Sequence, residues 1–239
     1  MQALSAERLL RAWELGRDRH PIDRGVLLHA LAEPDADPDA LADQPLGQRN
    51  RALFALRAAT FGRQLPAWLD CPACGERLEL SLDTASFDTL APPAEGPVEV
   101  AGLRLRLRLP TSRDLAALAG DTSAGDAALR LLEHCLITAP GAPTPALAPL
   151  LDAASEALEQ ADPWADLLFA STCGACGHAW DVRLDIAAFL WEELDARAQR
   201  LLDEVHLLAS AYGWPEADIL ALSEPRRAAY LQRVEGVTA

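Results

Sequence analysis

The sequence predicts an α+β fold that is mainly helical, and three observations support this prediction. Apolar residues recur at helical spacing at both ends of the 239-residue chain, most clearly from Ile186 to about Tyr212. Strict alternation of apolar and polar residues predicts short strands, of which residues 103–109 are the clearest. Two CxxC pairs, each followed by a glycine and then by an alternating stretch, lie far apart in the chain. We therefore expect helices at both ends and a split β element between them.

The N-terminal region, residues 1–69, is predicted to be helical. Ser5 can cap a first helix, and a proline at the first position begins a second helix over 21–32. Residues 33–45 are acidic and interrupted by proline, so we expect a linker there. A third helix is predicted over 45–62, ending at a glycine. Three arginines of this helix are expected to face outward: Arg49, Arg51 and Arg57.

Residues 85–164 are predicted to form an insertion of one β-hairpin followed by helices. The hairpin has strands at 98–100 and 103–109 with a turn at Ala101 and Gly102, and the helices are expected over 110–119, 124–137 and 147–160, with a loop at 140–145. The arginines of the second strand (Arg104, Arg106 and Arg108) form either the solvated face of an amphipathic strand or an anion-binding face. Cys135 lies in an apolar helical stretch and is predicted to be a buried packing residue.

The C-terminal region, residues 186–239, is predicted to be helical throughout. Asp185 can cap a long helix that continues to about Tyr212, where Gly213 stops it. Two shorter helices are expected over 215–222 and 226–234.

The two cysteine pairs predict a zinc ribbon divided between residues 70–84 and 165–185. Each pair resembles a zinc knuckle, in which two thiolates lie on a tight turn and a glycine relieves the strain of that turn. Strands are expected at 77–82, 167–170 and 179–184. Four thiolates would fill a tetrahedral site and leave no position for water, which indicates a structural Zn²⁺ and not a catalytic one. The predicted ligands are Cys71, Cys74, Cys173 and Cys176.

Two other uses of these residues were weighed. A CxxC pair can carry out redox chemistry, but such a pair normally occurs once and beside a βαβ pattern, which is missing here. His178 follows the second pair and could replace a cysteine, although four thiols already complete the site. A role outside the ligand set is the preferred interpretation for His178.

Charge and motifs exclude several classes of function. The net charge of −15 and the pI of about 4.7 oppose nucleic-acid binding through a basic surface. The sequence has no apolar run long enough to span a membrane and no signal-peptide pattern, so we expect a cytoplasmic protein with reduced cysteines. It also has no HExxH, GxGxxG, P-loop or GxSxG motif, and we expect no enzymatic activity.

Three aromatic residues are the candidate partner-binding surface. Trp191 lies near the start of the long C-terminal helix, and Tyr212 and Trp214 form the corner where it ends. One interpretation is aromatic packing where two helices meet. The other is an exposed anchor for a partner protein, because Trp and Tyr dominate the energetics of protein interfaces.

Four stretches of the C-terminal third carry a further similarity: residues 186–191, 204–214, 218–222 and 226–231. On these stretches the chain from Cys173 to the C-terminus resembles the T4-type phage baseplate (hub assembly) proteins of contractile tails and phage-tail-like contractile injection systems. The resemblance extends more weakly back to about residue 45. It also includes similarity to small tail-assembly chaperones. No single motif is diagnostic of the family.

The resemblance implies a structural or assembly role without catalysis, with other baseplate, hub, spike or tail proteins as partners. It offers no catalytic residues, and it favours Tyr212 and Trp214 as the contact surface. The alternative is a stand-alone zinc-ribbon adaptor or a non-catalytic subunit of an enzyme. An acidic surface suits the first function, because a chaperone can shield a basic or apolar partner until assembly.

Overall fold

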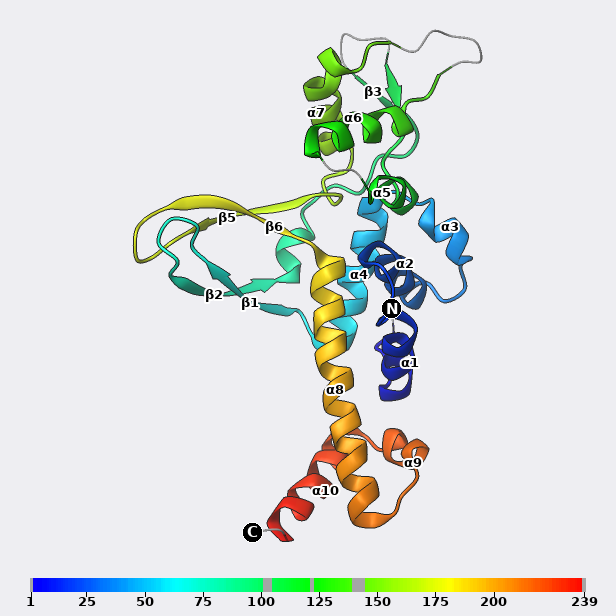
Figure 1. Cartoon of the computed structure of the whole chain (residues 1–239), viewed down its shortest axis with the longest axis vertical. Helices are drawn as coiled ribbons and strands as arrows, with labels where there is room; N and C mark the ends of the chain where they lie inside the picture. The colour runs from blue at the N-terminus through cyan, green and yellow to red at the C-terminus, as the bar shows by residue number, and fades with distance from the viewer. Residues whose placement is uncertain (1, 101–104, 121–122, 139–144, 238–239) are drawn as a thin grey trace.

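The computed structural model describes residues 2–100, 105–120, 123–138 and 145–237, and it shows a mixed helical and β structure. One long helix, α8 (Ile186–Tyr212), runs along the long axis of the molecule (Figure 1). The N-terminal helices lie beside α8, an inserted lobe lies at one end, and the last two helices lie at the other (Figure 1). These helices are α1 (Ala6–Gly16), α2 (Pro21–Ala32), α4 (Leu46–Phe61), α9 (Glu216–Ala221) and α10 (Glu224–Val237).

The helix ends follow the local signals in the sequence. Ser5 Oγ accepts a hydrogen bond from the N–H of Arg8 at the start of α1, and Asp185 caps α8 through the N–H groups of the first turn. Gly62 and Gly213 end α4 and α8 with φ of 92° and 69°, values that favour glycine. The predicted caps and stops of these helices are therefore confirmed.

The acidic segment 33–45 contains a short helix that the sequence analysis did not predict. This helix, α3 (Pro38–Ala42), begins at Asp37, whose carboxylate accepts a hydrogen bond from the N–H of Asp39. Leu41 is fully buried and fixes the helix on the body of the protein. The expected linker therefore contains one short helix, which the burial of Leu41 holds against the rest of the protein.

The prediction that the arginines of α4 face outward was wrong for two of the three. Arg49 is 7% exposed and Arg57 is 1% exposed, and only Arg51 is on the surface. Arg49 donates hydrogen bonds to Asn50 and Ser112, whereas Arg57 binds both carboxylate oxygens of Glu193. Helix α4 contacts α2 on one side and α8 on the other, so it has little solvent face on which to place a charge.

The described residues form two separate hydrophobic clusters. The larger one joins α1, α2, α4 and α8 with residues from the bases of the hairpins, and it includes Leu28, Leu53, Leu56, Leu65, Trp164, Leu167, Leu190, Leu194 and Leu201. The smaller one lies in the inserted segment and contains Val100, Leu105, Leu107, Leu132, Cys135, Leu147 and Ala154. Cys135 is fully buried in this second cluster, which confirms its predicted role as a packing residue.

The inserted segment has the predicted order of elements. A short hairpin pairs β3 (Val98–Glu99) with β4 (Arg106–Leu107), and the turn and strand residues 101–104 lie outside the described residues. Most of the predicted loop, residues 140–144, also lies outside them. The remaining elements are η1 (Thr84–Phe87), α5 (Ser112–Leu118), α6 (Ala124–Cys135), η2 (Ala148–Leu150) and α7 (Leu151–Ala161).

The arginines of β4 fit the solvated interpretation in part. Arg106 is exposed, as expected for the outer face of an amphipathic strand. Arg108 instead forms a bidentate ion pair with Asp114, with N···O distances of 2.6 and 2.7 Å. The strand ends at Leu107, two residues earlier than predicted, because Arg108 turns toward the start of α5.

A buried carboxylate joins the exit of the insertion to the start of α4. Asp162 Oδ2 accepts a hydrogen bond from the N–H of Gly47 at 2.9 Å, across 115 positions of sequence. A helix N-terminus has free N–H groups, so this carboxylate caps α4 from another part of the chain. Burial raises the pKa of Asp162.

We expect Gly47→Ala to destabilise the protein by about 2 kcal/mol, because it breaks this buried contact. A Cβ at Gly47 would lie 1.7 Å from Asp162 Oδ1, so the carboxylate must move away. Urea unfolding measures the effect. Gly125→Ala is the matched control: nothing lies within 4 Å of its added Cβ, and alanine improves helix propensity by up to about 1 kcal/mol. An equal effect of the two substitutions would contradict the role of Asp162.

Candidate metal centre

Two antiparallel hairpins form an arm that projects from the helical body (Figure 1). The first pairs β1 (Gln64–Asp70) with β2 (Arg77–Asp83), and the second pairs β5 (Leu167–Thr172) with β6 (Ala179–Leu184). Strand β1 was not predicted, because Trp68 and Leu69 were interpreted only as a lead into the first cysteine pair. Each hairpin carries one CxxC pair in its turn.

The two turns have the same local geometry. In the first turn, the N–H of Gly75 donates a hydrogen bond to the carbonyl of Cys71 at 2.8 Å. In the second turn, the N–H of Gly177 donates to the carbonyl of Cys173 at 2.9 Å. Both glycines have φ of 73°, a value that side-chain-bearing residues rarely adopt. The glycine after each pair therefore lets the chain reverse and point two sulfur atoms toward the other hairpin.

The four cysteines meet at the tip of the arm. Their Sγ atoms all lie within 4.8 Å of one another. Cys71 lies 3.7 Å from Cys176, and Cys74 lies 3.7 Å from Cys173. Four sulfur atoms placed tetrahedrally at about 2.3 Å from a metal are about 3.8 Å apart, so these distances fit a four-thiolate site. A disulfide requires about 2.05 Å between the sulfurs. The four thiols could therefore hold a metal ion.

The cluster has an approximate twofold arrangement. The first cysteine of each pair is buried, with Cys71 at 3% and Cys173 at 1% exposure, and the second cysteine of each pair is exposed. Each buried sulfur lies next to an exposed sulfur of the other hairpin. Both hairpins thus contribute equally, and neither alone presents a complete site.

Hydrogen bonding shifts the pKa values of Cys173 and Cys74 in opposite directions. The backbone N–H of Cys176 lowers the pKa of Cys173 to about 7. For Cys74, the backbone N–H of Glu76 lowers the pKa, but hydrogen bonds with Cys176, Cys71 and Cys173, together with desolvation, outweigh it and raise the pKa to about 12. Four thiolates this close would repel one another, and a divalent cation removes that repulsion. Metal binding would therefore release protons from the cluster.

His178 does not belong to the cysteine cluster. Its ring is exposed and stacks on Trp180, with 5.8 Å between ring centroids and an interplanar angle of 16°. Its backbone carbonyl accepts a hydrogen bond from the N–H of Cys173 at 2.8 Å. The residue thus shapes the turn through its main chain, while its side chain lies on the surface.

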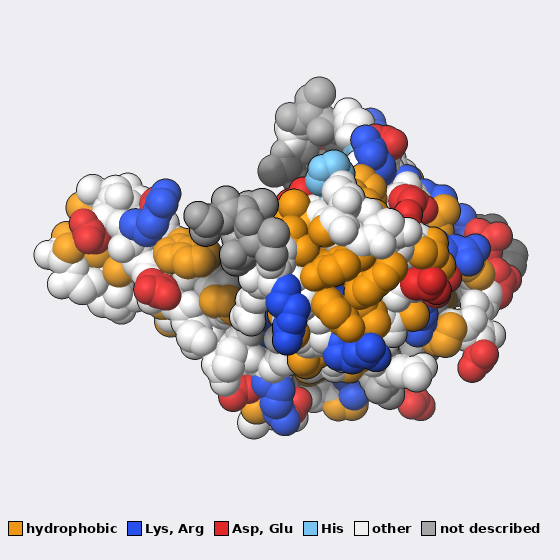
Figure 2. Space-filling view, turned by 90° about the horizontal axis from the view of Figure 1, so that it is seen from below, with side chains coloured by type: hydrophobic (Ala, Val, Ile, Leu, Met, Phe, Trp, Pro, Cys, Tyr) orange, Lys and Arg blue, Asp and Glu red, His pale blue; other side chains and the backbone are white. Residues whose placement is uncertain are grey.

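Tyr212 and Trp214 form a cluster with a third aromatic residue at the far end of the molecule. Tyr212 stacks on Trp214 at 4.6 Å, and Tyr230 of α10 packs edge-on against Trp214 at 4.9 Å. Tyr212 is 39% exposed, and the other two rings are half-buried. Figure 2 views the molecule from this end and shows hydrophobic side chains gathered among Arg, Asp and Glu. We call Tyr212, Trp214 and Tyr230 the aromatic cluster; the sequence analysis did not single out Tyr230.

Trp191, by contrast, lies in the core. It is 7% exposed, and its ring packs against Gly16, where an added Cβ would lie 2.5 Å from the indole. Arg24 stacks on the same ring at 4.6 Å. The interpretation of Trp191 as an exposed anchor is therefore wrong, because α1 and α2 cover this part of α8.

A charged network holds α10 against α8 behind the aromatic cluster. Glu204 accepts hydrogen bonds from Arg197 at 2.7 Å and from Arg227 at 2.8 Å, and Arg227 is 4% exposed. Burial alone would raise the pKa of Glu204, but Arg197 and Arg227 outweigh it and lower the pKa below its usual value. The ionised carboxylate is thus the form that the folded protein favours.

We expect Glu204 to make the stability of the protein depend on pH. Because its folded pKa lies below the unfolded one, its contribution is present above the unfolded value of about 4.5 and is lost as the pH falls through the folded pKa. Urea unfolding at pH 7 and in the acid range should show that acid lowers the free energy of unfolding less for Glu204→Gln than for the wild type. Parallel pH profiles of the two proteins would contradict this role. Glu216→Gln, an exposed substitution on α9, is the control.

Among the helices of the described residues, none is both long and apolar enough to cross a membrane. Comparison of the chain with protein-family models, with curated proteins and with solved structures found no match.

Proposed function

We propose that this chain is a non-enzymatic component or assembly chaperone of the baseplate or hub of a contractile phage tail or related injection system, with a structural Zn²⁺. The observation that carries the proposal is the position of the aromatic cluster. It lies in the C-terminal segment that carries the resemblance to baseplate proteins, and Tyr212 is exposed at the end of the molecule. Exposed aromatic residues are the side chains that contribute most to protein interfaces.

The choice of zinc rests on the chemistry of the ligand set. Four thiolates in a tetrahedral arrangement are typical of Zn²⁺ and of iron–sulfur sites. Four protein ligands leave no open position for a substrate or water, so the proposed role of the metal is structural. The metal would fasten the hairpin that follows α4 to the hairpin that precedes α8.

In the proposed arrangement, the metal site that fastens the two hairpins and the surface that binds the partner lie in different parts of the molecule. The arm lies beside the body near the start of α8, and the aromatic cluster lies where α8 ends (Figure 1). A helix of 27 residues joins the two regions. We infer that the metal fixes the orientation of α8, and that α8 then presents the aromatic cluster to a baseplate partner.

Deletion of the gene in a host that produces the particle tests the proposal. Loss of intact particles, restored by the wild-type gene but not by Tyr212→Ser with Trp214→Ser, is the expected result. Mass spectrometry of purified particles then distinguishes a component from a chaperone, because only a component remains in them. Unchanged particle yield and shape after deletion would overturn the assembly role.

A second candidate function is an adaptor that binds its partner through the arm. Trp68 is 62% exposed and Leu168 is 54% exposed, one on each hairpin. Large apolar side chains on a projecting arm are suited to contact another protein. Gene deletion separates the two candidates: the baseplate proposal expects particles to be lost, whereas a stand-alone adaptor predicts unchanged particles and a partner whose capture is abolished by Trp68→Ser.

A further inference from the structure

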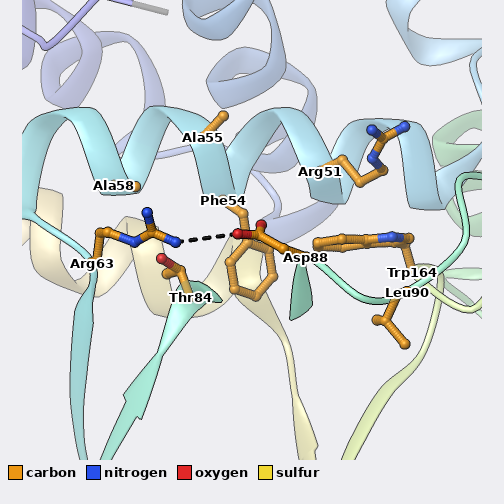
Figure 3. A pocket seen from close by; sticks show the side chains of 9 residues that line it. All are labelled: Arg51, Phe54, Ala55, Ala58, Arg63, Thr84, Asp88, Leu90 and Trp164. Carbon is orange, nitrogen blue, oxygen red and sulfur yellow. Dashed lines mark hydrogen bonds and ion pairs between the residues drawn. The ribbon is translucent and has the colours of Figure 1, made fainter. Parts of the chain in front are cut away.

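A groove between α4 and the start of the insertion has the features of a small-ligand site. Its volume is about 380 Å³, which lies in the range of pockets that bind small molecules. Figure 3 shows the groove with the side chains that line it. Phe54, Leu90 and Trp164 supply apolar surface, and Arg51 and Arg63 lie toward its two ends (Figure 3).

The groove is open because α4 carries small residues there. Ala55 and Ala58 follow Arg51 by one and two helical turns, so they lie on the same side of the helix and do not fill the space. The rings of Phe54 and Trp164 meet at 5.5 Å and both contact Phe87, at 4.9 and 6.3 Å. Each of these three aromatic residues is less than 9% exposed, so they form a fixed floor.

Two donors beside the groove, the guanidinium of Arg51 and the indole N–H of Trp164, have no acceptor among the described residues, whereas Arg63 is paired with Asp83 and Asp88. Arg51 stacks over Trp164 at 5.9 Å and has no carboxylate within ion-pair distance in the described part of the chain. The indole N–H of Trp164 is fully buried, and none of the described residues accepts a hydrogen bond from it. Asp88 is the one carboxylate that lines the groove, and it is engaged by Arg63 at 3.2 Å (Figure 3).

We infer that this groove binds a small apolar monocarboxylic acid, a property independent of the proposed baseplate role. Arg63 is already paired with Asp88 at 3.2 Å and with Asp83 at 3.6 Å, so among the described residues that line the groove Arg51 is the one arginine left for a ligand carboxylate. The carboxylate would pair with Arg51, while the apolar body of the acid lies on the aromatic floor and next to the ring of Trp164. Such a site stands out in a chain whose net charge is −15.

Titration of the full chain with hydrocinnamate tests the inference, with the indole N–H signal of Trp164 in a ¹H–¹⁵N spectrum as the readout. We expect this signal to shift and saturate with hydrocinnamate. Hydrocinnamyl alcohol, which has the same body without the charge, should bind at least about tenfold more weakly. No shift with the acid, or equal binding of acid and alcohol, would overturn the inference.

Three variants locate the binding. Arg51→Gln should weaken hydrocinnamate binding about tenfold or more, and Ala58→Leu should abolish it by filling the groove. Arg11→Gln, an exposed arginine of α1, should leave the affinity unchanged. Thermal unfolding checks that each variant is folded. Binding that survives both Arg51→Gln and Ala58→Leu would place the acid elsewhere and refute the site.

Discussion

Replacing Cys71 by serine is expected to abolish metal binding at the proposed site and to lower the free energy of unfolding by about 4 kcal/mol. The metal would link Cys74 to Cys173 across 99 positions of sequence, so it closes a very long loop. A cross-link over a loop of that length stabilises a protein by roughly 4–5 kcal/mol through the entropy of the unfolded chain. The energy of the metal site is in this sense folding energy.

Elemental analysis and urea unfolding measure this prediction together. We expect one zinc per chain for the wild type and none for Cys71→Ser or Cys173→Ser. Cys135→Ala is the matched control, because Cys135 is fully buried in the insertion and away from the cluster. It should retain one zinc and lose only about 1 kcal/mol of stability. A metal-free wild type that unfolds at the same urea concentration as the metal-loaded protein would show that the cluster does not fasten the fold.

Arg57→Met is expected to cost about 3 kcal/mol, the second large effect. The Arg57 side chain is 1% exposed and binds both oxygens of Glu193 at 2.9 and 2.7 Å, and it also donates to the carbonyl of Gly62 at the end of α4. Removing one partner of a buried pair leaves the other charge without compensation, and this loss exceeds the net value of the pair. Glu193 is 23% exposed, so water recovers part of the cost.

A double-mutant cycle isolates the pair. Arg57→Met with Glu193→Met should be less destabilised than the sum of the single variants, with a coupling of about 2 kcal/mol. Arg51→Met is the control on the same helix, because Arg51 is exposed and its loss should change stability by no more than about 0.5 kcal/mol. Additive single effects would mean that Arg57 stabilises the protein through packing alone.

The two buried arginines show where sequence periodicity stops being informative. Apolar spacing correctly predicted a helix over 45–62, but it gave no reason to bury Arg49 or Arg57. Their burial depends on partners from distant segments, Ser112 for Arg49 and Glu193 for Arg57. The same limit explains Trp191 and Tyr230, since the neighbours of both residues come from other parts of the chain.

The sequence alone determined the features that neighbouring residues decide. A CxxC followed by glycine specifies a tight turn, Ser5 and Asp185 specify helix starts, and Gly62 and Gly213 specify helix ends, because each signal acts within one or two turns of the chain. Only the tertiary structure decided that the cysteine pairs meet, and that the aromatic residues divide between the core and the surface. Those outcomes depend on packing between segments that lie far apart in the chain, as for Trp13 and Asp195, which are 182 positions apart, and no local pattern encodes which distant surfaces will come together.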